Sequence, residues 1–186
     1  MATFSPMLRE FAGAKKRDYC DCEIAELNAV SSVASQSISE RAGMLKPFRR
    51  DFYHSLEKQG WQLGFRFGDF PRMGRIQAAV TIDAVKTLDC SDCAHRHRLL
   101  IEMCTDNRQA ILANLLKLEF AGRKFVERYP TAVPCGLGIF VTQGRKPALV
   151  AKGCVDGSIG TLEEYEIQAT GPWEGLLTNS LIALTL

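Results

Sequence analysis

Long apolar runs, a strong net charge and repeated or low-complexity segments are all missing from this sequence. No window of about 18 residues is both uncharged and apolar, so no segment is expected to cross a membrane as a helix. The balance of 24% charged and 46% hydrophobic residues excludes a disordered chain, a collagen-like repeat and a coiled coil. The N-terminus carries charges where a signal peptide needs an apolar stretch, which favours a cytoplasmic protein.

Charge and cysteine content narrow the function classes only a little. A formal net charge of +2, from 23 basic and 21 acidic side chains, is too weak to indicate a nucleic-acid-binding protein. It does not exclude one, because such a protein needs a local basic patch and not a basic total. The seven cysteines are an odd number in a chain without an export signal, so free thiols or a metal site are favoured over a framework of disulfides.

The apolar pattern predicts a single α/β domain over 1–186, with a mixed sheet of about five strands flanked by helices. An N-terminal helical or loop extension is expected over 1–45, with a loop or short helix over 1–34 where serines lower helix propensity, and the core over 46–186. Alternating or apolar runs predict the strands: 61–67, 75–86, 98–105, 136–142 and 180–186. Helices are predicted over 47–59, after a cap at Asp106 or Asn107, and after a capping box of Thr161 and Glu164.

Two acidic residues interrupt strands that otherwise favour burial. Glu102 lies in the apolar run from Leu99 to Cys104, and Asp83 lies in the preceding β-branched run. Because side chains alternate along a strand, Glu102 and Cys104 share one face. If the two strands are neighbours, the acids can converge and hold Mg²⁺, which prefers oxygen ligands. The alternative is that each acid faces solvent on a half-exposed sheet.

A cluster of cysteines and histidines follows in the connection between these two strands. A CxxC pair and two histidines could make a set of four zinc ligands: Cys90, Cys93, His95 and His97. Cys20 and Cys22 could instead supply thiolates. A third alternative is a polar hairpin with free thiols and surface histidines. A redox function for the CxxC pair is weaker, because a redox motif usually opens a helix after a strand.

The segments around the two acids resemble the active-site region of a known family. Ile82 to Lys86, a hairpin, and Ile101 to Arg108 follow the order seen in the PD-(D/E)XK nucleases, and more narrowly in the BamHI/BglII/BstYI group of type II restriction endonucleases. That group carries an Asp on one strand, Glu-X-Glu or Glu-X-Gln on the next, and then a helix. The tail is similar as well, with Asp156-Gly157-Ser158, a Glu-Glu-Tyr helix and a last apolar strand. The resemblance covers approximately residues 45–186.

The resemblance implies a restriction-endonuclease-like core and sequence-specific, metal-dependent cleavage of double-stranded DNA. Asp83, Glu102 and the main-chain carbonyl of Met103 would hold Mg²⁺ or Mn²⁺, which would lower the pKa of an attacking water. In the family a Lys, Glu or Gln at the place of Cys104 orients this water, and Glu57 would add an acidic group from an upstream helix. A palindromic DNA site would also imply a homodimer.

Cys104 departs from the family pattern, because a thiol is a poor partner for Mg²⁺. Arg108 or Asp106 could take its role, or Mn²⁺ could suit the site better. Otherwise Cys104 is a small buried apolar residue, and the protein is a zinc-stapled DNA-binding or regulatory protein without catalysis. For Glu57 the alternative is a solvated surface acid. The candidate DNA contacts are Asn107, Arg108, Arg72 and Arg75.

Overall fold

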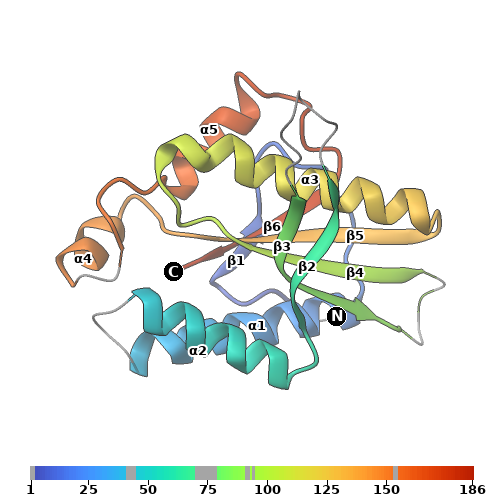
Figure 1. The fold of residues 1–186 in the computed structure, drawn as a ribbon, viewed down its shortest axis with the longest axis horizontal. Helices are drawn as coiled ribbons and strands as arrows, with labels where there is room; N and C mark the ends of the chain where they lie inside the picture. The colour runs from blue at the N-terminus through green and yellow to red at the C-terminus, as the bar shows by residue number, and fades with distance from the viewer. Residues whose placement is uncertain (1–2, 41–44, 70–78, 91–92, 94, 153–154) are drawn as a thin grey trace.

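A six-stranded mixed sheet forms the centre of the molecule (Figure 1). The computed structural model describes residues 3–40, 45–69, 79–90, 93, 95–152 and 155–186. The strands are β1 (Leu8–Glu10), β2 (Gln62–Asp69), β3 (Ala79–Leu88), β4 (Arg96–Met103), β5 (Ala132–Phe140) and β6 (Ser180–Thr185). Their order is β1-β6-β5-β4-β3-β2. Strands β2, β3 and β4 are antiparallel neighbours, β4, β5 and β6 run parallel, and β1 is antiparallel to β6.

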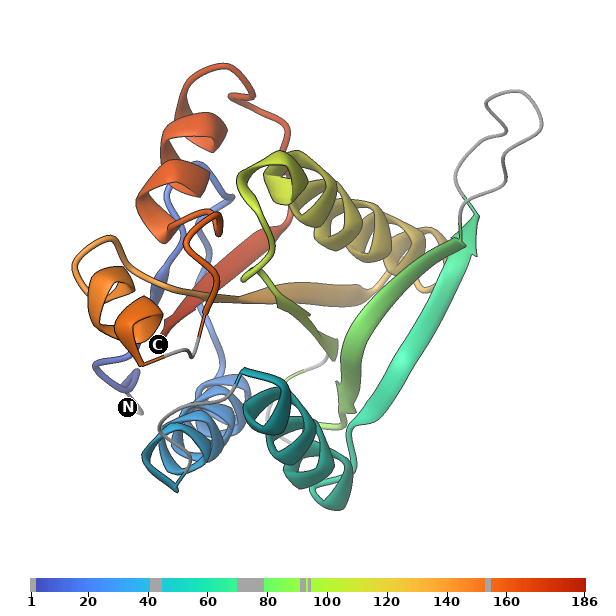
Figure 2. The same cartoon turned by 60° about the vertical axis from the view of Figure 1, so that its left-hand side comes forward.

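Helices cover both faces of this sheet (Figures 1 and 2). Helices α1 (Asp21–Glu40) and α2 (Leu45–Lys58) lie side by side on one face, and α3 (Ile111–Arg128) and α5 (Leu162–Thr170) lie on the other. The short helix α4 (Lys146–Ala151) follows β5. The α/β class and the sheet flanked by helices are therefore as predicted.

Side chains on the central strand β4 point alternately to the two faces of the sheet, and each face has its own apolar cluster. Leu99 and Ile101 join the apolar cluster beneath α1 and α2, whereas Leu100 joins the cluster beneath α3 and α5. On α2, Phe48, Phe52 and Leu56 are buried, which confirms the predicted stripe. Glu102, which follows Ile101 on β4, is buried as well.

The predicted capping box is confirmed. Thr161 Oγ1 accepts a hydrogen bond from the N–H of Glu164, and the Glu164 carboxylate accepts one from the N–H of Thr161 at 2.8 Å. The predicted side-chain cap at Asp106 or Asn107 is wrong. A 3₁₀ turn (Arg108–Ala110) precedes α3, and Asn107 makes no capping bond there. The backbone at this point is held instead by a bridge from Asn107 to Ile159.

The prediction of a loop or short helix over residues 1–34 is wrong, because α1 is a regular helix of 20 residues. One face of it buries Leu27, Val30 and Val33 against the sheet, and tertiary packing outweighs the low propensity of the serines. Ser37 bonds back to the carbonyl of Val33 at 2.8 Å, which satisfies its hydroxyl within the helix. The count of about five strands is also short by one, because β1 is a three-residue edge strand.

Candidate functional site

Strands β3 and β4 stop pairing with each other at the positions of the two predicted acids. Among the described residues, backbone pairing between these strands ends with Ala84 opposite Ile101. The next positions are Asp83 and Glu102. Beyond them β3 continues alongside β2, and β4 continues alongside β5. The fold thus brings the two acids to one opening in the sheet.

Asp83 is held in place from two sides at this opening. Its Oδ2 atom accepts a hydrogen bond from the N–H of Met103 at 2.9 Å and another from the hydroxyl of Tyr53 at 2.6 Å. Burial, followed by the negative charge of Asp83, raises the pKa of Tyr53, so that hydroxyl stays protonated and donates. Asp83 and Tyr53 are both partly exposed. The carboxylate is therefore fixed in orientation but not sealed from solvent.

Glu102 is the more deeply buried of the two acids, with 2% of its surface exposed. Lys117 of α3 donates to its Oε1 atom, whereas its Oε2 atom is buried and has no hydrogen-bond partner among the residues that the structure describes. Burial and then the negative charge of Asp83 raise the pKa of Glu102 to about 7, although Lys117 opposes the shift. The positive charge of one lysine therefore does not compensate the negative charge of both carboxylates.

A second cation lies close by, on helix α2. Arg49 donates to Thr105 Oγ1 at 2.9 Å and lies 3.6 Å from Asp106 Oδ1. About the opening, two carboxylates, one ammonium and one guanidinium are thus contributed by four different elements, β3, β4, α3 and α2. Carboxylate oxygens of this kind are the ligands preferred by Mg²⁺ and Mn²⁺.

Cys104 and Glu57 lie away from these contacts. Cys104 is fully buried in the apolar cluster that includes Ile111 and Leu115, and burial raises the pKa of its thiol well above the usual value. Glu57 is exposed and lies 3.9 Å from His54 on its own helix. The residue of α2 that reaches Asp83 is Tyr53, one turn before Glu57.

The candidate DNA contacts are only partly within the described residues. Arg108 is exposed, and its Nε atom lies 2.7 Å from Glu164 Oε1. Asn107 is exposed as well and pairs through its backbone with Ile159. Arg72 and Arg75 lie outside the described residues.

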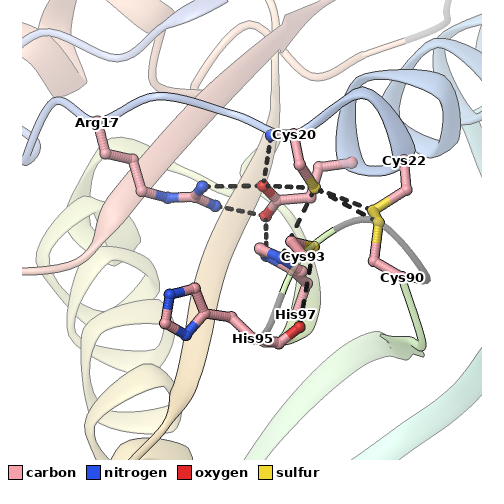
Figure 3. The surroundings of a disulfide bond; sticks show 8 residues. Arg17, Cys20, Cys22, Cys90, Cys93, His95 and His97 are labelled. Atoms are coloured by element: carbon pink, nitrogen blue, oxygen red, sulfur yellow. Dashed lines mark hydrogen bonds and ion pairs between the residues drawn. A yellow bond between two sulfur atoms is a disulfide. The ribbon is translucent and has the colours of Figure 1, made fainter.

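Four cysteines gather at the opposite end of the β3–β4 pair, where the two strands are connected (Figure 3). Cys20 precedes α1 and Cys22 lies in its first turn, while Cys90 and Cys93 lie in the connection, and all four sulfurs are within 4.8 Å of one another. Cys22 and Cys90 are joined by a disulfide with their Cα atoms 6.3 Å apart. Cys20 Sγ lies 3.9 Å from Cys90 Sγ. This arrangement is compatible with a zinc site.

Buried polar groups lie directly behind the cysteines (Figure 3). His97 Nε2 is 3.0 Å from Cys93 Sγ, and His97 Nδ1 is 3.1 Å from Glu23 Oε1. Glu23 is fully buried and accepts a hydrogen bond from Arg17 NH1 at 2.8 Å. Burial alone would raise the pKa of Glu23, but the hydrogen bonds and charge of Arg17 outweigh it and lower the pKa.

His95 is exposed and belongs to neither of the residue groups that could hold a metal ion among the described residues. Of the predicted zinc ligands, the structure thus brings Cys90, Cys93 and His97 together with Cys20 and Cys22. Sequence reasoning missed the groups that support both sites: Lys117, Tyr53, Arg49, Glu23 and Arg17. Lys117, Tyr53 and Arg49 carry no local signal, because each reaches its partner on another element of the fold. Arg17 and Glu23 are six residues apart, and the burial of their pair depends on packing against the sheet.

None of the helices in the described part of the chain combines the length and apolar character that crossing a bilayer requires. Comparison with known proteins adds no relative, since neither a protein-family model nor a curated protein sequence matches this chain.

Proposed function

We propose that this protein is a metal-dependent endonuclease that hydrolyses phosphodiester bonds in double-stranded DNA at specific sequences, on a restriction-endonuclease-like core. The observation that carries the proposal is the pair of carboxylates, Asp83 and Glu102, at the opening between β3 and β4. The order of strand, connection, strand and helix that the resemblance implies corresponds to β3, residues 89–95, β4 and α3.

The donor set at the opening fits a hard divalent cation. Glu102 Oε2 is a buried oxygen to which no residue in the described part of the chain donates a hydrogen bond, and a bound cation would compensate its charge. Asp83, Glu102 and the main-chain carbonyl of Met103 would hold Mg²⁺ or Mn²⁺. When bound, such an ion lowers the pKa of a water molecule and neutralises charge on the scissile phosphate.

The protein's own residues have defined tasks in this proposal. Tyr53 and the N–H of Met103 fix the orientation of Asp83 before any ligand arrives. Arg49 provides positive charge beside Thr105 and Asp106, just past the end of β4, where it could contact a DNA phosphate. Asn107 and Arg108 begin the segment leading into α3 and remain candidates for DNA contact. A homodimer would present two such openings to a palindromic site.

The test is cleavage of bacterial genomic DNA, which contains every short sequence many times, with Mg²⁺ or Mn²⁺. A limit digest, in which the fragment lengths stop changing with time, is expected from the natural protein, and no cleavage is expected from Asp83→Asn or Glu102→Gln. Asp89→Asn is the matched control, because Asp89 is an exposed acid just past the other end of β3. Intact DNA with both metals, or unchanged cleavage by the Asp83 and Glu102 variants, would contradict the proposal.

We also infer that the four cysteines bind a structural Zn²⁺ when they are reduced. Tetrahedral zinc with bonds of about 2.3 Å needs sulfurs separated by about 3.8 Å, close to the spacing of Cys20 and Cys90. The disulfide and the zinc site are alternative states of the same sulfurs. A thiol reductant would supply two electrons and two protons to Cys22 and Cys90, and Zn²⁺ would then displace the protons of all four thiols.

Metal analysis of protein purified under reducing conditions tests the zinc site. We expect about one zinc per chain, reduced below about a tenth in Cys20→Ser and Cys93→Ser. Cys135→Ala is the control, because Cys135 is a free cysteine buried in β5 outside the cluster. Metal-free protein that keeps the Cys22–Cys90 disulfide after mild reduction would overturn the inference.

A second candidate function is a zinc-stapled DNA-binding or regulatory protein that does not cut. The burial of Cys104 favours it, because position 104 offers no charged group to the opening. Sequence-selective gel shifts without cleavage in Mg²⁺ and Mn²⁺ would support this candidate over the nuclease.

A further inference from the structure

We propose that a pocket between β2, β4 and the C-terminal end of α3 binds a nucleotide, with its phosphate on Arg98 and Arg128 and its base against the ring of Phe67. The pocket has a volume of about 500 Å³, within the range of small-ligand sites. The inference goes beyond the proposed nuclease function and does not depend on it, because neither the paired carboxylates nor the cysteines line this pocket.

Positive charge is concentrated around the pocket. Its basic lining residues are Arg66, Arg98, Lys124 and Arg128, and the acidic one among the described residues is Glu127. Lys124 Nζ lies 2.6 Å from Glu127 Oε2, so this acid is already paired with one of the cations. The pocket therefore keeps an excess of positive charge, which a bound anion would compensate.

Arg98 is half-buried but has no carboxylate partner in the described ranges of the chain. Burial lowers the pKa of its guanidinium, and the positive charges of Arg96 and Arg128 act in the same direction. Other arginines lie at most 3.8 Å from a carboxylate oxygen, namely Arg9, Arg17, Arg49, Arg50, Arg96, Arg108 and Arg123. A half-buried guanidinium without such a partner favours the binding of an anion.

The Arg98 guanidinium is also held in a fixed orientation. It donates from Nη1 to Thr87 Oγ1 at 2.8 Å, and its central carbon lies 5.0 Å from the ring centroids of both Phe65 and Phe125. Its Nε atom is buried and has no acceptor among the residues described. The donors that remain on its two terminal nitrogens are available to phosphate oxygens, which a planar guanidinium binds with defined geometry.

Aromatic rings supply the apolar part of the pocket. Phe65 and Phe67 are both half-buried, with their ring centroids 4.8 Å apart and their planes at 65°. Proteins that bind unpaired nucleotides pack the bases on aromatic and guanidinium surfaces of this kind. Inorganic phosphate would leave this apolar surface uncovered, so the combination of rings and arginines favours a nucleotide over a simple anion.

The register of β4 separates this pocket from the other two sites. Arg98 lies opposite Thr87, four positions along the strands from Glu102 and Asp83. Because side chains alternate along a strand, Arg98 points to the α3 face of the sheet, whereas the neighbouring His97 contacts the cysteines on the other face. Substitutions in the pocket can therefore be compared without altering a proposed metal ligand.

Calorimetric titration of the natural protein with adenosine 5′-monophosphate, without added Mg²⁺ or Mn²⁺, tests the proposal. We expect one nucleotide to bind per chain. Adenosine should bind at least about tenfold more weakly, because it lacks the phosphate that the arginines hold. Inorganic phosphate should also bind at least about tenfold more weakly, because it lacks the base that packs on the rings.

Variants then assign the binding to this pocket. Arg98→Gln should weaken nucleotide binding at least about tenfold, and Phe67→Leu about fivefold. Arg128→Gln should weaken it about threefold or more, and since Arg128 is exposed this variant keeps the test valid if Arg98→Gln does not fold. Arg145→Gln is the matched control, because it removes one exposed positive charge just before α4, and its affinity should stay within about twofold.

A single-stranded oligoadenylate distinguishes a free nucleotide from a nucleotide within a strand. Displacement of the mononucleotide by this strand, with the same losses in Arg98→Gln and Phe67→Leu, would identify the strand as the source, and no displacement would identify the free nucleotide. The proposal would be overturned if the natural protein binds no nucleotide or binds inorganic phosphate equally well. Unchanged affinity in both Arg98→Gln and Arg128→Gln would overturn it as well.

Discussion

Two buried glutamates at opposite ends of the β3–β4 pair have pKa values shifted in opposite directions. At the connected end, Arg17 and His97 lower the pKa of Glu23 despite its complete burial. At the open end, burial and Asp83 raise the pKa of Glu102 to about 7. The first carboxylate is fully compensated within the protein, whereas the second keeps a deficit of positive charge. On the proposed function, this difference distinguishes a structural site from one that would receive a cation.

The ligand chemistry of the two ends differs in the same way. Sulfur and imidazole at the connected end suit zinc, and carboxylate oxygen at the open end suits Mg²⁺ or Mn²⁺. The cysteines join the start of α1 to the β3–β4 connection, which is a cross-link between segments distant in sequence. The carboxylates instead lie where strands separate. Substitutions at the two ends should therefore have different effects on stability and on activity.

The largest expected effect is that of removing a ligand of the proposed zinc site at the connected end. Because a structural zinc contributes to folding directly, Cys93→Ser should lower the melting temperature by at least about 10 °C, or abolish cooperative unfolding. Circular dichroism during heating measures this. Cys135→Ala should cause a much smaller shift, and equal shifts in the two variants would show that the cluster has no special role in stability.

The next effect comes from the ion pair behind the cysteines. Arg17→Met leaves Glu23 buried without its main partner and should reduce the free energy of unfolding by about 3–5 kcal/mol. Arg9→Met is the matched control, because Arg9 is half exposed in its pair with Glu166 and should cost at most about 1 kcal/mol. Urea denaturation at neutral pH compares the two. A similar cost for both would mean that water reaches Glu23.

At the open end, a substitution that removes charge should have the opposite effect and raise the free energy of unfolding. The pKa of Glu102 is raised from 4.5 to about 7 in the folded protein, so folding favours its protonated form and the free energy of unfolding falls as pH rises through this range. Glu102→Gln should therefore stabilise the protein at pH about 8, in the absence of Mg²⁺, by about 1–3 kcal/mol. At pH about 4, below both values, the variant should match the natural protein.

The control for this reversal is Glu57→Gln, since Glu57 is exposed and should change stability by less than about 0.5 kcal/mol at either pH. Urea titrations at the two pH values give the result. If Glu102→Gln destabilises the protein at the higher pH, the pair with Lys117 is worth more than the burial of Glu102 costs, and the contrast between the two glutamates disappears.

The sequence predicted the parts of this picture that have a local signal. The stripe of Phe48, Phe52 and Leu56 and the capping box at Thr161 depend on near neighbours, and both are confirmed. Asp83 and Glu102 stood out because a charge in an apolar strand is visible without a fold. Helix α1 was missed because its stability comes from packing, which outweighs its serines.

The partners of the site residues could not be predicted in the same way. Lys117 lies on one of the two helical layers and Tyr53 on the other, and only the packed fold brings both to the β3–β4 opening. The sequence left open whether Cys20 and Cys22 or the two histidines accompany the CxxC pair. That choice depends on the start of α1 lying beside the β3–β4 connection, a contact across about 70 residues of chain.

The smallest expected effect sharpens the comparison at the open end. Tyr53→Phe removes one of two hydrogen bonds to Asp83 while keeping the ring packed, so the free energy of unfolding should fall by about 1 kcal/mol. If Tyr53 orients Asp83 for metal binding, cleavage should slow by about tenfold, which corresponds to a similar energy. Tyr129→Phe at the end of α3 is the control for both assays. A loss of stability without a loss of rate would show that the N–H of Met103 alone suffices to orient Asp83, and that the Tyr53 hydroxyl contributes only to folding.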